Sequence, residues 1–205
     1  MSFRRRLAVI AASSLLLAGC AVPGQGAAPG VAAEYDGTTL TTAGLDQLAA
    51  AWAEDSDGLV APTRDQVATY ALIGPAAVAA TEDTDSPITT GVAANVASAW
   101  FEYVGVTDAE ISDEVVEQVR EILAVYVLSL TDEDTQAQLA EIAADVEDSG
   151  LFSPRLGDFS AEALSASMAD AQTQASNLGL GTYTFIMYTD VSGFSAPDVS
   201  WAARD

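Results

Sequence analysis

The sequence predicts a mainly α-helical domain that also contains a small β-sheet formed by N- and C-terminal strands. Apolar residues recur at helical spacing through most of residues 41–176, and hydroxyl or acidic residues stand at the expected helix starts. β-forming residues cluster near residues 31–40 and 182–188. Residues 31–205 are long enough to make one domain with its own core.

The two ends of this domain carry the expected strands. Residues 31–40 contain a β-like stretch, the turn dipeptide Asp36-Gly37 and a short return, which predicts a hairpin. Residues 182–188, TYTFIMY, are rich in β-forming residues and predict a strand. We expect that strand to pair with residues 32–35.

Hydroxyl residues mark the expected helix starts. Thr41 or Thr42 caps a helix that runs to about Trp52. Thr63, Thr107 and Thr131 are each followed three residues later by an acidic or amide side chain, the pattern of a capping box. The helices predicted after these starts cover residues 64 to about 80, 114–130 and 132–147, and a further alanine-rich helix covers 161 to about 176.

Two prolines bear on the helix boundaries. Pro75 follows Gly74 and is expected to kink or end the helix that starts near residue 64. Pro87 fits the first turn of another helix, which ends near Gly105. The helix at 114–130 has two adjacent apolar stripes and belongs in the middle of the bundle, with Glu117, Gln118, Arg120 and Glu121 outside the stripes.

The N-terminus predicts export and lipidation. Residues 1–6 are cationic, and the apolar run Leu7 to Leu17 is too short to span a bilayer. Leu17-Ala18-Gly19-Cys20 resembles a bacterial lipobox, which implies cleavage after Gly19, a diacylglycerol on the Cys20 sulfur and an acyl chain such as palmitate on its nitrogen. Residues 1–19 are then a signal peptide, 20–30 a lipidated flexible tether and 31–205 the domain, held at the extracytoplasmic face of the cell membrane.

Two other export routes stay open. One is a soluble secreted protein cleaved at an ordinary Ala-x-Ala-like site. The other is twin-arginine export directed by the arginines at positions 4–6.

Composition excludes several kinds of chemistry. The chain has no histidine, no lysine and a single cysteine, which excludes a Ser-His-Asp triad, a P-loop, a Schiff base and, once Cys20 is acylated, a thiol nucleophile. Carboxylate chemistry remains, but we predict no catalytic residue and no cofactor. All 30 acidic residues follow Cys20, and only four arginines oppose them there, so this part of the chain carries a net charge of −26. Such a charge excludes nucleic acid as a partner, and it fits solubility or adaptation to salt.

Local patterns suggest no metal site. Residues 54–58, EDSDG, lack the bidentate glutamate of a calcium loop, and Asp132-Glu133-Asp134 fits a helix N-terminus. The aromatic residues Trp52, Trp100, Phe101 and Tyr103 fit either the core or the lining of a groove.

The irregular stretch 151–159 carries the candidate binding residues. It contains Pro154, Arg155 and Gly157. Arg155 either neutralises carboxylates and fixes the turn or binds a ligand.

Three segments together resemble SurA N-terminal-type domains of small lipoproteins in high-GC Gram-positive bacteria. They are Ala32 to Thr41 with the helix after it, Thr63 to Val67 with Leu72-Ile73, and Ser153-Pro154-Arg155-Leu156-Gly157-Asp158-Phe159, where Ser153 and Leu156 replace the Asn and the aromatic residue of the family pattern. The resemblance implies a helical, chaperone-like domain that binds unfolded or extended protein segments at the cell envelope. The 46 residues after Phe159 are too few for a parvulin domain, so isomerase activity is not implied.

The expected function is therefore non-enzymatic binding of protein clients, as a chaperone or adaptor. Two alternatives stay open, a carboxylate-dependent hydrolase and a structural subunit of an envelope complex.

Overall fold

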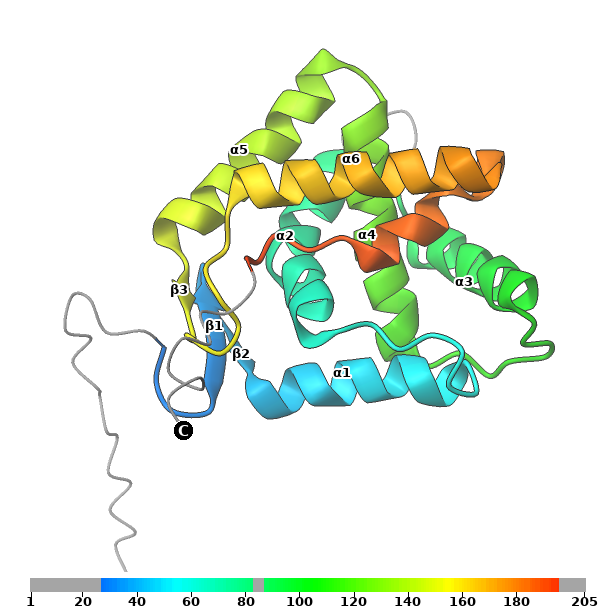
Figure 1. Cartoon of the computed structure of the whole chain (residues 1–205), viewed down its shortest axis with the longest axis horizontal. Helices are drawn as coiled ribbons and strands as arrows, with labels where there is room; N and C mark the ends of the chain where they lie inside the picture. The colour runs from blue at the N-terminus through cyan, green and yellow to red at the C-terminus, as the bar shows by residue number, and fades with distance from the viewer. Residues whose placement is uncertain (1–26, 83–86, 196–205) are drawn as a thin grey trace, which may run out of the picture.

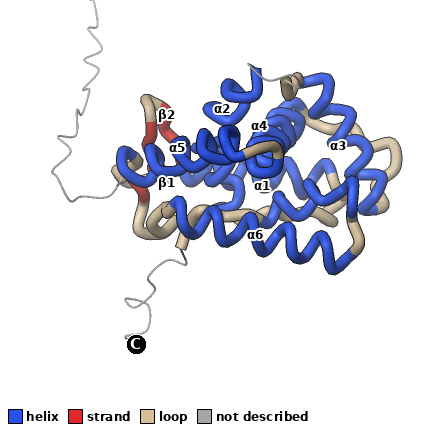
Figure 2. Tube along the Cα trace, turned by 90° about the horizontal axis from the view of Figure 1, so that it is seen from above, coloured by secondary structure: helices blue, strands red, loops and turns tan. Residues whose placement is uncertain are grey.

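The computed structural model describes residues 27–82 and 87–195 and is mainly helical, with a small antiparallel sheet at one end (Figures 1 and 2). This confirms the predicted fold class. The elements in chain order are β1 (Val31–Tyr35), β2 (Thr38–Thr41), α1 (Thr42–Asp55), α2 (Arg64–Glu82), α3 (Thr90–Val104), α4 (Asp113–Leu130), α5 (Glu133–Ser149), β3 (Leu151–Phe152), α6 (Ala161–Leu178) and the 3₁₀ helix η1 (Gly181–Asp190).

The N-terminal hairpin forms as the sequence predicts. Strands β1 and β2 pair antiparallel, and the turn between them has φ values of 44° at Asp36 and 74° at Gly37. Positive φ at both central residues matches the right-handed twist of the strands, which explains the Asp-Gly pair. Thr41 then caps α1, because its side chain accepts a hydrogen bond from the backbone N–H of Gly44 at 3.0 Å.

The third strand is not where the sequence places it. Residues 182–188 lie in the 3₁₀ helix η1, and the strand that pairs with β1 is β3, in the order β2-β1-β3. Tyr188 explains the difference, because its buried side chain is bonded on several sides. Its hydroxyl contacts Ser129 Oγ of α4 and Gln172 Nε2 of α6, each at 2.8 Å, and its carbonyl accepts from the Tyr70 hydroxyl of α2. The segment thus packs among helices, away from the sheet.

Helix α4 lies at the centre of the bundle, as predicted, but more of its surface is buried than the sequence indicates. Gln118 and Glu121, expected outside the apolar stripes, are both buried. Helices α2 and α3 pack on α4, and the α2–α4 pair is the most extensive helix contact in the described chain. Helix α2 continues through Pro75 to Glu82, which shows that this proline does not end it.

Two predicted helix starts are wrong. Residues 107–112 precede α4, whose N-cap is Ser112 and not Thr107. The Asp55 carboxylate at the end of α1 accepts hydrogen bonds from the backbone N–H of Ser112 at 2.8 Å and from its hydroxyl at 2.7 Å. Pro87 lies outside α3, which begins at Thr90 after the cap Thr89.

Other helix boundaries agree with the sequence to within a residue or two. Helix α5 is capped by Asp132, one residue after the predicted Thr131, in a full capping box with Thr135. Helix α6 ends at Gly179, whose φ of 67° is the left-handed conformation that glycine adopts readily.

The aromatic residues at helical spacing belong mainly to the core. Trp52 of α1 packs against Trp100 and Phe101 of α3, with ring centroids 5.0 and 6.2 Å apart. These three side chains are buried, whereas Tyr103 is exposed and stacks on Tyr183. The core interpretation therefore holds for three of the four.

Candidate functional site

A groove of about 270 Å³ lies between α5 and α6. The two helices meet next to β3 and diverge toward their other ends (Figure 1). Small and apolar side chains make up most of its lining, which consists of Ser129, Gln136, Leu139, Ala140, Ala143, Ala161, Leu164, Ser165, Met168, Ala169 and Gln172. Alanine and serine fill little space, so their side chains do not close the gap that opens where α5 and α6 diverge.

Hydrogen bonds hold the closed end of the groove. The first backbone N–H of α6, at Ala161, donates to Glu147 Oε2 of α5 at 2.8 Å. The Tyr35 hydroxyl of β1 donates to Asp145 Oδ2 of α5 at 2.6 Å, and burial together with the Asp145 charge raises the pKa of Tyr35 to about 12. The C-terminal half of α5 is thereby fixed to both the sheet and α6.

The groove has an apolar floor and a more polar open end. Leu139, Ala143 and Leu164 are buried beneath it. Toward the open end lie Gln136 and Gln172, and the Gln172 amide is oriented by its bond to the Tyr188 hydroxyl. Such a surface accepts an apolar side chain and offers hydrogen bonds at one edge.

The charge around the groove is negative. Helix α5 carries six acidic residues and helix α6 carries two, and neither helix has a basic residue. None of the described residues that line the groove has an ionisable side chain. The groove therefore provides shape and a negative surrounding field, and its described lining offers no ionisable side chain as a general acid or base.

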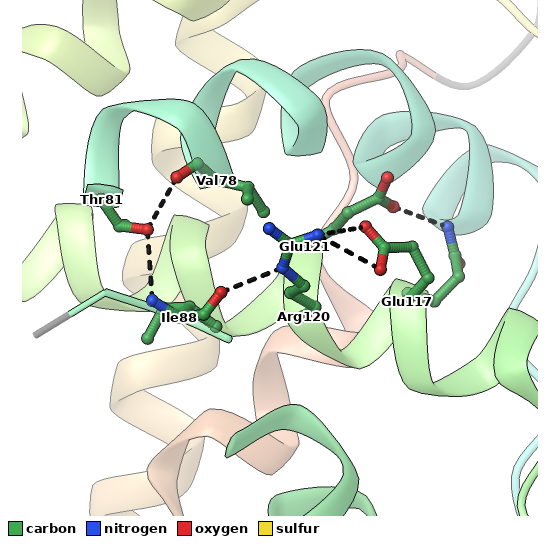
Figure 3. A network of polar contacts seen from close by, with 7 residues as sticks. Val78, Thr81, Ile88, Glu117, Arg120 and Glu121 are labelled. Carbon is green, nitrogen blue, oxygen red and sulfur yellow. Dashed lines mark hydrogen bonds and ion pairs between the residues drawn. The ribbon is translucent and has the colours of Figure 1, made fainter. Parts of the chain in front are cut away.

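The most perturbed carboxyl group lies elsewhere, at Glu121 of α4. Its side chain is 8% exposed, and desolvation, helped by the nearby Glu117 charge, raises its pKa to about 8. Gln118 Nε2 donates to Glu121 Oε2 at 3.0 Å. Arg120 directly precedes Glu121 in the chain, but its guanidinium donates instead to the Ile88 carbonyl and to Glu117 Oε1, both at 3.0 Å (Figure 3).

Glu121 is therefore largely neutral at pH 7 and lacks a direct cationic partner in the described residues. It lines neither the groove nor the acidic pocket between α1 and α4 that contains Glu54, Asp55 and Glu114. The hydrolase alternative needs two carboxyl groups with separated pKa values in one cleft, and the geometry of Glu121 does not supply this pair.

The sequence-predicted binding residues lie on a turn after β3. The backbone N–H groups of Leu156 and Gly157 donate to the Ser153 carbonyl at 2.9 and 3.2 Å, and Gly157 has a φ of 94°. Pro154 and Arg155 are exposed, and Gly157 is buried. Within residues 27–82 and 87–195 the Arg155 guanidinium forms no ion pair, and its two proposed roles, neutralising carboxylates or binding a ligand, stay predictions.

None of these three residues lines the α5–α6 groove. The lipidation and cleavage residues, Cys20 and Gly19, lie outside the described residues. Sequence reasoning missed the groove. The available signal was the row of alanines and serines in residues 140–169, which is equally typical of close helix packing.

Comparisons of the chain with protein-family models, curated proteins and solved structures gave no match. In the described part of the chain, no helix combines the length and the hydropathy needed to cross a membrane. No cluster of three or more acidic or cysteine side chains there is arranged to hold a metal ion.

Proposed function

We propose that this protein is a lipid-anchored, non-enzymatic binding protein at the outer face of the cell membrane, and that the α5–α6 groove holds apolar side chains of client proteins. The groove itself is the observation that carries this proposal, since it is apolar, open and formed by helices whose ends are fixed. The lipobox-like Leu17 to Cys20 supports the location.

The charge of α5 and α6 favours a particular client chemistry. The two helices that form the groove carry eight carboxylates and no basic group between them, so the preferred segment combines apolar and basic residues. Opposite charges increase the association rate and are screened by salt. A client segment exposed by partial unfolding meets this description wherever leucine and arginine alternate.

Peptide binding tests the proposal. The probe is a fluorescein-labelled peptide of repeated Arg-Leu-Ala units, and fluorescence anisotropy measures its affinity for the full chain in detergent. A Glu-Leu-Ala peptide of the same length is the control for charge. We expect the basic peptide to bind, the acidic peptide not to bind, and added salt to weaken the basic complex.

A pair of matched variants locates the binding site. Ala169→Trp fills the groove from its exposed rim, whereas Ala166→Trp adds the same side chain at an exposed position of α6 that does not line the groove. Ala169→Trp should weaken binding by about tenfold or more, the effect of losing one good apolar contact, and Ala166→Trp should leave it unchanged. Equal affinities for the two variants would remove the groove from the proposal.

A further inference from the structure

A chain of hydrogen bonds that runs into the core holds the Gln172 side chain of α6 in one orientation. Gln172 Nε2 donates to the Tyr188 hydroxyl at 2.8 Å. The Ser129 hydroxyl donates to the Tyr126 carbonyl at 2.8 Å, so in its 2.8 Å contact with the Tyr188 hydroxyl Ser129 accepts and Tyr188 donates. Tyr188 has no second proton to give, so the group that meets its oxygen from the other side is a donor. This order fixes the amide nitrogen of Gln172, and not its oxygen, toward Tyr188.

Tyr188 is a rigid support for this amide. Its side chain is fully buried, and its ring packs edge-on against Tyr126 of α4, with the ring centroids 5.0 Å apart. The Tyr70 hydroxyl of α2 donates to its backbone carbonyl. Because ring, hydroxyl and backbone of Tyr188 are all held, the Gln172 amide is oriented before a ligand arrives. Such preorganisation reduces the entropy lost on binding.

The oxygen of the Gln172 amide is left for a ligand. Gln172 is half-buried and lines the groove, and among the described residues its Oε1 has no hydrogen-bond partner. Gln136 of α5 also lies at this end of the groove, but no hydrogen bond within the described chain orients its amide. An amide oxygen accepts hydrogen bonds, and a backbone N–H is the donor that every extended protein segment carries, except at proline.

The oriented amide lies one helical turn from an apolar part of the lining. Met168 and Gln172 are four residues apart on α6 and both line the groove, so their side chains share a face and are separated by a rise of about 6 Å. An extended chain advances about 3.3 Å per residue. A client residue whose side chain rests on Met168 is therefore within about two positions of the residue whose N–H reaches Gln172.

We propose that Gln172 binds the main chain of an extended client, with Oε1 accepting from a backbone N–H while the apolar lining holds a neighbouring side chain. This inference rests on the proposed function and specifies its client class. Tyr188 is a positioning residue that does not touch the client. The contact selects extended segments, because the backbone N–H groups inside a helix are already bonded to carbonyls of the same helix. It is also independent of client sequence, since main-chain hydrogen bonds supply affinity without reading side chains.

Ester substitution in the client tests the contact. The probe is fluorescein-labelled Arg-Ala-Ala-Leu-Ala-Ala-Arg, whose single leucine is the side chain for the groove. Esters of the same sequence replace one backbone N–H at a time by oxygen, at the leucine and at the two positions on each side of it. Fluorescence anisotropy measures their affinities for the full chain in detergent, as wild type, Gln172→Met and Gln174→Met. Methionine keeps the side-chain length and removes the amide, and Gln174 is exposed on α6 and does not line the groove.

We expect one ester to bind the wild type about fivefold less tightly than the amide peptide, because one hydrogen bond is lost. The same ester and the amide peptide should bind Gln172→Met with nearly equal affinity, and Gln174→Met should behave as the wild type. If each ester loses the same factor on the wild type and on Gln172→Met, the inference is refuted and the proposed function stands. If the amide peptide fails to bind, the inference falls, and the proposed function falls with it unless the Arg-Leu-Ala peptide binds.

Tyr188→Phe tests the positioning role. The ring keeps its packing but loses the hydroxyl that holds Gln172, so the discrimination between amide and ester should fall, whatever happens to the overall affinity. In ¹⁵N-labelled wild type without peptide, the side-chain amide protons of Gln172 should exchange with water more slowly than those of Gln174, and Tyr188→Phe should remove this difference. Equal exchange at Gln172 and Gln174 in the wild type would show that the amide is not held, and would overturn the inference independently of any client.

Discussion

Gly74 of α2 lies directly against the Glu121 side chain of α4. A Cβ atom on residue 74 would come within 2.5 Å of Glu121 Cβ, 2.6 Å of Cγ and 2.8 Å of Cδ. The missing side chain at position 74 allows the two helices to approach this closely, and the approach removes the Glu121 carboxyl from water. One glycine thus explains both the tight α2–α4 packing and the raised pKa of about 8.

Gly74→Ala should destabilise the domain. Alanine normally stabilises a helix interior relative to glycine by about 1 kcal/mol, but here the added methyl overlaps three carbon atoms of Glu121. Overpacking of this kind costs about 1–3 kcal/mol, so we expect a lower midpoint of urea denaturation. Gly91→Ala is the control, because its Cβ would meet only Thr89 Oγ1 at 3.9 Å. If Gly74→Ala is as stable as Gly91→Ala, the close contact between Gly74 and Glu121 does not limit the packing of α2 on α4.

Glu121→Gln should make the domain more stable at high pH. The pKa of Glu121 rises from 4.5 to about 8 on folding, so the folded state keeps a proton that the unfolded state releases above pH 4.5. The stability contribution of Glu121 is therefore fully present below pH 4.5 and is lost as the pH rises through 8. At about 1.4 kcal/mol per pKa unit, the difference amounts to a few kcal/mol.

Thermal unfolding at pH 5 and pH 9 measures this difference. The Tm of Glu121→Gln should exceed that of the wild type by a larger margin at pH 9 than at pH 5. Glu141→Gln, an exposed change on α5, controls for the loss of one negative charge. A margin that does not change with pH would show that Glu121 is not the group responsible.

Asp55→Ala should weaken the start of α4. The Asp55 carboxylate accepts two hydrogen bonds from Ser112, and their loss leaves the N-cap without its partner from α1. Hydrogen bonds to a charged group contribute about 1.5–3 kcal/mol, so chemical denaturation should show a loss in that range. The neighbouring change Glu54→Ala should lower the free energy of unfolding clearly less. Similar losses for the two variants would show that the removed negative charge, and not the hydrogen bonds to Ser112, is responsible.

Cys20→Ser should release the protein from the membrane. The expected lipid is attached to the Cys20 sulfur, and the acidic domain has little attraction for anionic headgroups. Cell fractionation should find the wild type and the tether variant Gln25→Ala with the membrane, and Cys20→Ser elsewhere. Mass spectrometry that detects a free thiol at Cys20 in the wild type would refute the anchor.

The sequence predicts local features of the fold well. The hairpin depends on Asp36 and Gly37 themselves, and the end of α6 depends on Gly179, so neighbouring residues suffice to place them. The strand expected at 182–188 fails for the opposite reason. Tyr188 is held by Tyr70, Ser129 and Gln172, which are distant in the chain and override the local β preference.

The buried carboxyl group of Glu121 and the α5–α6 groove depend even more on distant contacts. Helical periodicity places Glu121 away from the core, and only the approach of α2 at Gly74 reveals its burial. The alanines of α5 and α6 show a similar ambiguity, because Ala143 and Ala169 are equally suited to a close contact or to the wall of a groove. The difference arises from how far α5 and α6 diverge after their shared end at Glu147 and Ala161.

The middle position of β1 has a mechanical consequence. β1 is the first element of the described chain after the proposed anchor at Cys20, so under the lipid-anchor proposal any tension from the membrane reaches the sheet at this strand. Ladder hydrogen bonds in antiparallel pairs run perpendicular to the strands, and β1 is bonded to β2 on one edge and to β3 on the other. A force on β1 is therefore opposed by the hydrogen bonds of both neighbouring strands, so under this proposal the small sheet is the part of the domain that bears the load of the anchor.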